Sequence, residues 1–275
     1  MTDTNLHSFR VAKLEILAVD TLAQLGDATG FFCSYRGHTF LVTNWHVVSG
    51  RHYQTNLPLH RSQALPGVLK VHAHVANQTT LPFTAPTSST VFRIALLDQH
   101  GAGCWLDHPL FGSNVDVVAI EVNSRISDCA RVFRIDLESE LDRDAHLEVM
   151  DPVFVTGYPL SATTTPNSLP IYKSGTIASE PRVFDSEPRI YIDGKTKTGM
   201  SGSPVMIKRN AKDTQDNAEL LRNGLGLVGI YSGRDRQERT EFEAELGIVW
   251  PYKECLIPIV EAFVEMSAET RQAAP

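Results

Sequence analysis

The most constraining feature of this sequence is a series of short apolar runs, each bordered by turn-forming residues, with no long amphipathic segments between them. The runs are about four to nine residues long and rich in Val, Ile, Phe and Thr. Parallel βαβ units need a helix of roughly 10 to 15 residues between strands, so the pattern argues against them. It predicts an all-β fold of antiparallel sandwiches or barrels, with strands at Val11–Val19, Gly30–Tyr35, Thr39–Thr43, Lys70–Val75, Val91–Leu97, Val115–Val122, Val153–Gly157, Gly175–Ala178, Arg189–Ile192, Pro204–Ile207, Gly226–Tyr231 and Gly247–Trp250.

Only the C-terminal part of the sequence has helical spacing. From Lys253 to Arg271 the apolar residues recur at helical intervals, which predicts an amphipathic helix that packs on the preceding sheet rather than on a partner protein. The polar, acidic segment Arg131–Met150 is interpreted as the connection between two domains. Arg51–Ser89 is interpreted as a long insertion and Lys208–Asn223 as a surface hairpin loop.

The composition excludes several classes of partner. Asp and Glu total 32 against 25 Lys and Arg, for a formal net charge of −7, and no basic run occurs, so we expect no nucleic-acid partner. No apolar run reaches the roughly 18 residues of a membrane span, and the N-terminus lacks a signal-peptide pattern, so we expect no membrane partner. The cysteines show no CxxC spacing, which favours a reducing, cytoplasmic location; they are Cys33, Cys104, Cys129 and Cys255.

The string Thr198–Val205, TGMSGSPV, predicts a nucleophilic serine. Ser201 lies in a turn rich in glycine, where backbone amides can converge near its hydroxyl. Acyl transfer needs this arrangement, because amide donors must point to where the oxyanion forms. Gly199 can orient its N–H without a Cβ clash. The ordinary reading of such a string is turn chemistry alone.

Two other strings could supply a base and a carboxylate. His46, in FLVTNWHVV, follows a strand-like run and could take the proton of a serine hydroxyl. Asp116, in NVDVVAI, stands at the start of an apolar strand, where a carboxylate is costly unless it is paired, for example with an imidazole N–H. Taken singly, His46 reads as a buried, hydrogen-bonded histidine and Asp116 as a turn residue.

Together the three strings resemble the chymotrypsin-like (trypsin-like) serine peptidases, in the order His46, Asp116, Ser201 and over most of the chain, roughly 28–251. TGFFCSYRGHTFLVTNWHVV is similar to the strand–turn–strand that delivers the family's histidine. LVGIYSG resembles the strand beside the substrate, and LGIVWP the strand that closes the specificity pocket. The run Asp193–Ser201 and the Gly-Ile-x-x-Pro ending are most similar to the bacterial Deg-type branch.

The resemblance implies two six-stranded antiparallel Greek-key β-barrels followed by a C-terminal helix. The first barrel would span 8–135 and carry His46 and Asp116; the second would span 136–252 and carry Ser201; the helix and tail would span 253–275. It implies a serine endopeptidase that hydrolyses peptide bonds of a peptide or protein substrate through an acyl-enzyme, with no cofactor and no metal.

The resemblance also assigns roles to single residues. Ser201 attacks the scissile carbonyl, His46 moves the proton, and Asp116 orients the imidazole. The N–H groups of Gly199 and Ser201 form the oxyanion hole, and Ser232 supports the aspartate. Asp98 and Asp107 are the alternative candidates for the carboxylate. The backbone from Ser232 to Arg234 is expected to pair with the substrate, and the substrate-binding residues are Lys195, Thr196, Thr198, Ser232, Gly233, Arg234 and Gly247.

Two departures from the family pattern bear on activation. Met200 stands where digestive members carry the aspartate that pairs with a new N-terminus, so activation by that ion pair is not expected. The oxyanion loop would then form constitutively, or be ordered by substrate or an activating protein partner. Val47 stands where the family has a disulfide cysteine, which leaves Cys33 as a small buried apolar residue.

Two hypotheses about the preferred side chain before the cut follow from the pocket residues. Lys195 occupies the position where trypsin has an acidic residue, and Arg234 falls at the pocket entrance, which would favour acidic side chains. Alternatively Lys195 points to solvent and the pocket takes small or medium apolar side chains.

Other readings of the sequence stay open. A zinc site is conceivable from His72, His74, His100, Cys104 and His108, but their irregular spacing argues against it. As alternatives to a constitutive enzyme, the chain could be a latent or partner-activated peptidase, or a binding module that keeps the peptidase fold without turnover.

Overall fold

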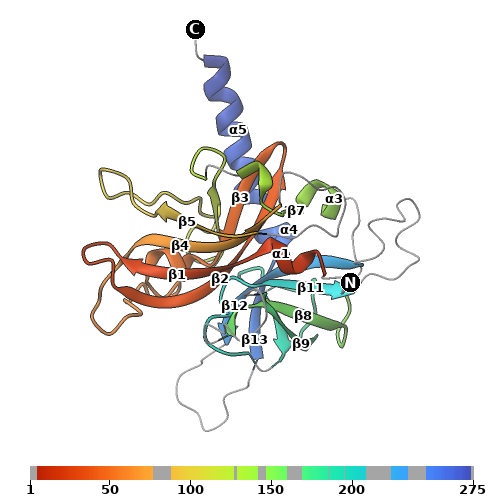
Figure 1. Cartoon of the computed structure of the whole chain (residues 1–275). Coiled ribbons are helices and arrows are strands. Elements are labelled where there is room, and N and C mark those ends of the chain that lie inside the picture. Colours follow the sequence, from red (N-terminus) through yellow and green to blue (C-terminus); the bar gives the residue numbers. More distant parts are fainter. Residues whose placement is uncertain are drawn as a thin grey trace.

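A computed structural model describes residues 5–76, 88–126, 129–141, 147–159, 169–184, 186–194, 196–208, 224–234 and 246–273. Its strands form two β units stacked on each other, with the C-terminal helix α5 projecting from the first unit (Figure 1). The predicted all-β fold with a C-terminal helix is therefore confirmed. Lys195 and most of the predicted hairpin loop over 208–223 lie outside the described residues.

The N-terminal unit is a seven-stranded sheet with the order β5-β4-β1-β2-β3-β6, to which β7 adds parallel to β2. The segment 103–106 joins its two edges, because Gly103 bridges Leu97 beyond β5 and Leu106 bridges Ala119 of β6. The elements of this unit are α1 (His7–Arg10), β1 (Val11–Ala18), β2 (Gln24–Tyr35), β3 (His38–Thr43), α2 (Trp45–Ser49), β4 (Pro66–Val75), β5 (Ser88–Ala95), β6 (Val118–Glu121), η1 (Cys129–Arg131), β7 (Ile135–Asp136) and α3 (Leu137–Leu141).

The C-terminal unit is a closed barrel with the strand order β10-β13-β12-β11-β8-β9. Its connectivity repeats that of the first unit. Around each sheet, the first three strands are neighbours in chain order, and the next three follow them in reverse chain order. The elements are β8 (Pro152–Gly157), β9 (Ile171–Ile177), β10 (Ile190–Asp193), β11 (Pro204–Lys208), β12 (Leu225–Arg234), β13 (Leu246–Pro251), α4 (Tyr252–Cys255) and α5 (Ile257–Ala273).

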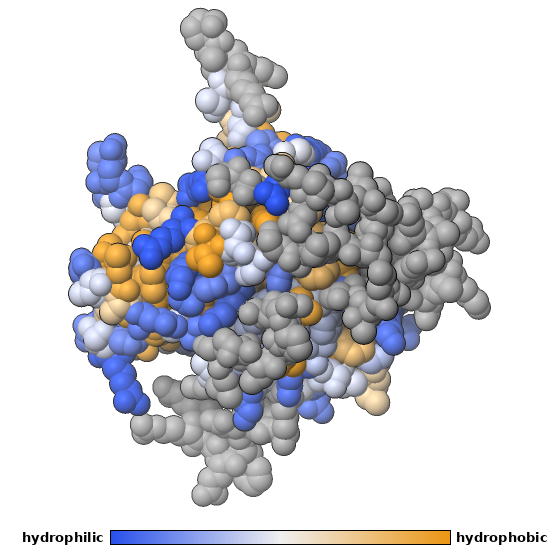
Figure 2. Space-filling model, in the orientation of Figure 1, coloured by the Kyte–Doolittle hydropathy of each residue, from blue (hydrophilic) through white to orange (hydrophobic). Residues whose placement is uncertain are grey.

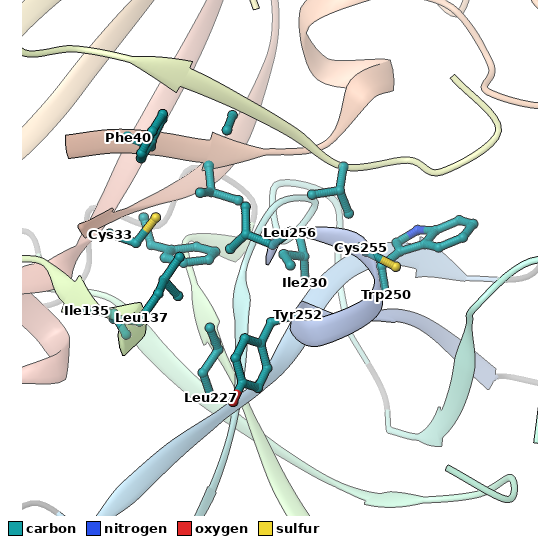
Figure 3. Packing of buried hydrophobic residues seen from close by; sticks show 14 of the residues in the cluster. Cys33, Phe40, Ile135, Leu137, Leu227, Ile230, Trp250, Tyr252, Cys255 and Leu256 are labelled. Carbon is teal, nitrogen blue, oxygen red and sulfur yellow. The ribbon is translucent and has the colours of Figure 1, made fainter. Parts of the chain in front are cut away.

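A shared hydrophobic core joins the two units. Figure 3 shows Cys33 and Phe40 of the first sheet facing Leu227, Ile230 and Trp250 of the barrel, with α4 between them. Because apolar surface from both units is buried in one cluster, their relative position is fixed by packing, and residues contributed by both units can hold a defined geometry.

The segment between the two units contributes to this core, which differs from its interpretation as a polar connection. Ile135 pairs with Cys33 and is buried, and Leu137 is buried beside it. The carboxylate of Glu140 accepts a hydrogen bond from the N–H of Leu227 at 2.9 Å. Sequence analysis did not identify Ile135 and Leu137 as core residues, because they stand among acidic residues and show no clear hydrophobic periodicity.

The C-terminal helix forms as predicted but also packs on a second surface. Phe263 of α5 makes edge-on contacts with His38 and Phe40 of β3, with ring centroids 5.2 and 5.6 Å apart. The helix thus packs on the first unit in addition to the preceding sheet. Helix α4 lies against β12 and β13, and α5 also contacts β6, while Ile257 and Val260 are buried in the core that both units share.

The surface and the cysteines complete the description. Apolar side chains are exposed at several points of the first unit, among them Val19 and Leu22 in the turn after β1 and Val91 in β5, and Figure 2 shows apolar residues interspersed with polar ones on one face. No helix in the described part of the chain is long and apolar enough to cross a membrane. All four cysteines are unpaired, and burial raises the pKa of the Cys33 thiol.

Candidate active site

His46 and Asp116 are joined by two hydrogen bonds at the edge of the first unit. The imidazole Nδ1 lies 2.6 Å from Asp116 Oδ2, and the backbone N–H of His46 donates to Asp116 Oδ1 at 2.8 Å. Ser232 Oγ of the second unit donates to Asp116 Oδ2. The Asp116 side chain is completely buried, so these three donors replace the water that a charged carboxylate would otherwise need.

The pairing of β3 with β6 explains why these two residues meet. Thr43, the last residue of β3, is the partner of Val118, the first residue of β6. His46 follows β3 on the short helix α2, which ends at Gly50 with a positive φ of 67°. Asp116 precedes β6. Because β3 and β6 are antiparallel, His46 and Asp116 lie at the same end of this strand pair.

Asp116 itself is not in a strand, which corrects the prediction that it starts one. Strand β6 begins at Val118, two residues later. The backbone carbonyl of Asp116 instead accepts a hydrogen bond at 2.7 Å from Nδ2 of Asn44, a buried side chain at the N-terminus of α2. Sequence reasoning missed Asn44, although its place two residues before His46 was visible.

The loop around Ser201 is held by its glycines and by a buried methionine. Gly199 and Gly202 have φ values of 96° and 83°, a region that L side chains rarely adopt. Between them the side chain of Met200 is completely buried in the core cluster of the C-terminal barrel. The loop is therefore anchored by the burial of an apolar side chain at position 200, where digestive members of the family use an aspartate in an ion pair.

Ser201 is tied to the first unit through the backbone. The N–H of Thr29 in β2 donates to the Ser201 carbonyl at 2.8 Å, and Thr43 Oγ1 donates to the Thr29 carbonyl at 2.9 Å. Among the hydrogen bonds of the described residues, none joins Ser201 Oγ to His46. Catalytic hydrogen bonds are often long before substrate binds. Thr29 and Thr43 were not among the predicted site residues.

The predicted substrate-binding residues lie around the ends of β12 and β13. Gly233 pairs with Ile248 and Arg234 with Gly247, while Ser232 is skipped by a bulge, which leaves its side chain directed to Asp116. Thr198 is exposed, and for Arg234 only the backbone is described.

Thr196 and Gly247 are linked by Tyr231. The hydroxyl groups of Thr196 and Tyr231 are hydrogen-bonded to each other. A Cβ atom at Gly247 would lie 2.6 Å from the Tyr231 ring. Tyr231 is almost completely buried, so its ring occupies the space between these two predicted pocket residues.

A half-buried tyrosine near Asp116 was also missed. Tyr53 packs edge-on against Trp250, with the ring centroids 5.7 Å apart. Burial raises the pKa of Tyr53 to about 12, and the nearby negative charge of Asp116 adds to this. Tyr53 therefore stays neutral beside the carboxylate at ordinary pH.

The alternative candidates are engaged elsewhere. Asp98 accepts hydrogen bonds from the N–H groups of His100 and Ala102, and Asp107 accepts one from the Trp105 indole. His72 is paired with Glu15 at 2.7 Å. The histidines and the cysteine weighed as zinc ligands form no group of three or more potential ligands within the described ranges.

Comparison with known proteins agrees with the sequence resemblance. The profile of the family described as "Trypsin-like peptidase domain" matches residues 28–211, more than half of the chain. No curated protein sequence matches the chain significantly.

Three solved structures also match most of the chain. The inactive form of the Rv3671c protease is 17% identical, with a TM-score of 0.46, over 90% of this chain and 85% of that one. The serine endoprotease from Yersinia pestis is 14% identical, with a TM-score of 0.45, over 92% of this chain and 64% of that one. Deg5 is 17% identical, with a TM-score of 0.43, over 90% of this chain and 85% of its own.

Proposed function

Since the chain belongs to the trypsin-like peptidase family, we propose that it is a serine endopeptidase whose catalytic residues are Ser201, His46 and Asp116. The observation that carries the proposal is the hydrogen-bonded pair of His46 and Asp116. The buried carboxylate accepts from Nδ1, so the proton-accepting nitrogen of the neutral imidazole is Nε2. That is the tautomer a general base requires.

The reaction follows from this arrangement. Ser201 Oγ bonds to the scissile carbonyl carbon while His46 Nε2 takes the hydroxyl proton, and the carbonyl oxygen becomes an oxyanion. The C–N bond then breaks as the imidazolium gives its proton to the leaving amine, which leaves an acyl-enzyme ester. Water repeats the sequence and releases the acid. Asp116 stabilises the imidazolium in both halves.

The oxyanion is proposed to bind to the N–H groups of Gly199 and Ser201. Neither N–H has an acceptor among the residues that the structure describes. The burial of Met200 supports a loop that is formed before substrate arrives, and therefore an enzyme that needs no activating partner. Each such donor is worth on the order of 3 kcal/mol of transition-state stabilisation.

A fluorophosphonate probe tests the proposal directly, because it reacts only with a serine that is activated by a base. We expect the wild type to be labelled and both Ser201→Ala and His46→Ala to be unlabelled while remaining folded. His60→Ala is a matched control, because His60 is partly exposed and its ring, among the described residues, bonds only to Ser62 in the same turn. This variant should be labelled like the wild type.

The other outcomes separate the alternatives. A folded but unlabelled wild type would contradict the proposal and favour a latent peptidase or a binding module. Labelling of the wild type only after a second protein is added would support partner activation. Labelling of Ser201→Ala would move the nucleophile to another residue.

For the side chain that precedes the scissile bond, we propose a small or medium apolar preference. Thr196, Tyr231 and Gly247 carry no charge, and the Tyr231 ring lies between the other two. The acidic preference would rest on Lys195 and on the side chain of Arg234, both outside the described residues.

A peptide library with one randomised position measures this preference. We expect products with Ala, Val or similar side chains before the cut to be enriched, and no enrichment of Glu or Asp. Enrichment of the acidic side chains would contradict the apolar proposal and favour the role of Lys195. The same library incubated with the Ser201→Ala variant supplies the background.

A further inference from the structure

Thr29 makes three hydrogen bonds from the first unit to the second, to Ser201, Gly199 and Tyr158, and the reaction as derived so far does not use its side chain. It lies in β2, where it pairs with Lys13 of β1, and it is completely buried. Its backbone N–H and carbonyl are both hydrogen-bonded, to the Ser201 carbonyl and to the Thr43 hydroxyl. A third group, the side-chain hydroxyl, makes two further hydrogen bonds.

The hydroxyl has a fixed direction. Thr29 Oγ1 donates to the Gly199 carbonyl at 2.8 Å and accepts from the N–H of Tyr158 at 3.1 Å. A hydroxyl has one proton, and an N–H can only donate, so the proton must point to Gly199. The strand β2 of one unit therefore holds the loop that precedes the nucleophile in the other.

Close packing prevents the hydroxyl from turning away. A Cβ atom at Gly157 would lie 2.7 Å from Thr29 Oγ1, and one at Gly202 would lie 2.1 Å from the Thr29 carbonyl. Both positions require glycine for the units to approach this closely. Within so tight a contact, a lost hydrogen bond has no room for a replacing water.

The consequence concerns the backbone of residues 199–201. The Gly199 carbonyl is held by Thr29 Oγ1, the Met200 carbonyl by the N–H of Ser203 at 3.0 Å, and the Ser201 carbonyl by the N–H of Thr29. All three acceptors are thus directed into the protein. In the described part of the chain, the N–H groups of Gly199 and Ser201 remain without acceptors.

We infer that Thr29 is a positioning residue, whose hydroxyl fixes the Gly199 carbonyl and thereby holds the neighbouring N–H groups ready for the oxyanion. The inference rests on the proposed peptidase function and deepens it. Gly199 has no side chain to restrict its backbone, so without this hydrogen bond its carbonyl could rotate. Any residue except proline at position 29 keeps the two backbone bonds, and only the hydroxyl is specific to Thr or Ser.

The test compares three variants with the wild type in the full chain. Thr29→Val keeps the shape and removes the hydroxyl, and Thr29→Ser keeps the hydroxyl. Thr156→Val is a matched control, since Thr156 is buried in β8 and its hydroxyl has no partner among the described residues. Measured quantities are the rate of fluorophosphonate labelling, kcat and KM for a peptide substrate, the affinity for a peptide boronate, and the urea midpoint.

We expect Thr29→Val to lower kcat, boronate affinity and labelling rate by about 10- to 100-fold, less than outright loss of an oxyanion donor, with KM nearly unchanged. Thr29→Ser and Thr156→Val should stay close to the wild type. If Thr29→Val fails to fold, Thr29→Ala, which adds no methyl group at the hydroxyl position, is measured instead.

Two results would overturn the inference while leaving the peptidase function intact. One is a labelled wild type with a hydroxyl-free variant that keeps full kcat and boronate affinity. The other is a loss of kcat that Thr29→Ser does not restore. A folded wild type that is never labelled overturns the proposed function and this inference together.

Discussion

Asp116→Asn is expected to lower kcat by about 10⁴-fold while the protein stays folded, the cost of this change in a Ser-His-Asp triad. The substitution keeps the shape of the side chain and removes its charge. Asp116 Oδ2 now accepts from both His46 Nδ1 and Ser232 Oγ. An amide has one oxygen, and the bond from the His46 backbone N–H to Oδ1 favours placing that oxygen there.

The amide nitrogen of the variant would then face Nδ1 and donate to it. This forces the imidazole into the tautomer with its proton on Nε2, which can no longer accept the proton of Ser201. The Ser232 hydroxyl can rotate to accept from the amide, so folding is preserved. The neutral amide also avoids the desolvation penalty that the fully buried carboxylate carries.

Kinetics of peptide hydrolysis and urea unfolding, measured on the same samples, check both parts of the expectation. Asp98→Asn and Asp107→Asn are matched controls, because the hydrogen bonds of these carboxylates among the described residues stay within the segment 98–107. Their turnover should equal that of the wild type. Normal turnover of Asp116→Asn, or a collapse in either control, would transfer the role to another carboxylate.

The fold was predictable because its strands carry local information. Runs such as Phe40–Val42 and Val205–Ile207 are apolar and bordered by turn residues, and they are strands in the structure. The docking of α5 could not be predicted in this way. Phe263 is apolar enough to pack on either unit, and the turn after α4 decides which one it meets.

The site residues also differ in how far the sequence predicted them. His46 and Asp116 stood out because a base and a carboxylate in apolar surroundings are costly unless they are paired. Thr29 and Asn44 did not stand out, since a threonine in a strand and an asparagine before a helix are ordinary residues. Their function depends on contacts with residues 170 and 72 positions away along the chain.

Gly202→Ala is expected to destabilise the protein by more than about 4 kcal/mol, in the range of severe core defects, and to abolish labelling of Ser201. A left-handed backbone alone costs an L residue about 1 to 2 kcal/mol. Here the new Cβ would also lie 2.1 Å from the Thr29 carbonyl oxygen and 2.4 Å from Thr43 Oγ1. Neither atom can move away without breaking the hydrogen bonds that join the two units.

The matched control is Gly37→Ala, which separates the two contributions. Gly37 has a φ of 80°, close to the 83° of Gly202, but a Cβ atom there would meet nothing within 4 Å. This variant should lose only the conformational cost and keep full labelling. Urea unfolding and fluorophosphonate labelling of both variants measure the difference. Equal stability of the two variants would contradict the expectation, because it would mean that the structure around Thr29 accommodates the new Cβ at no cost. Labelling of Gly202→Ala would mean that the reactivity of Ser201 does not depend on this contact.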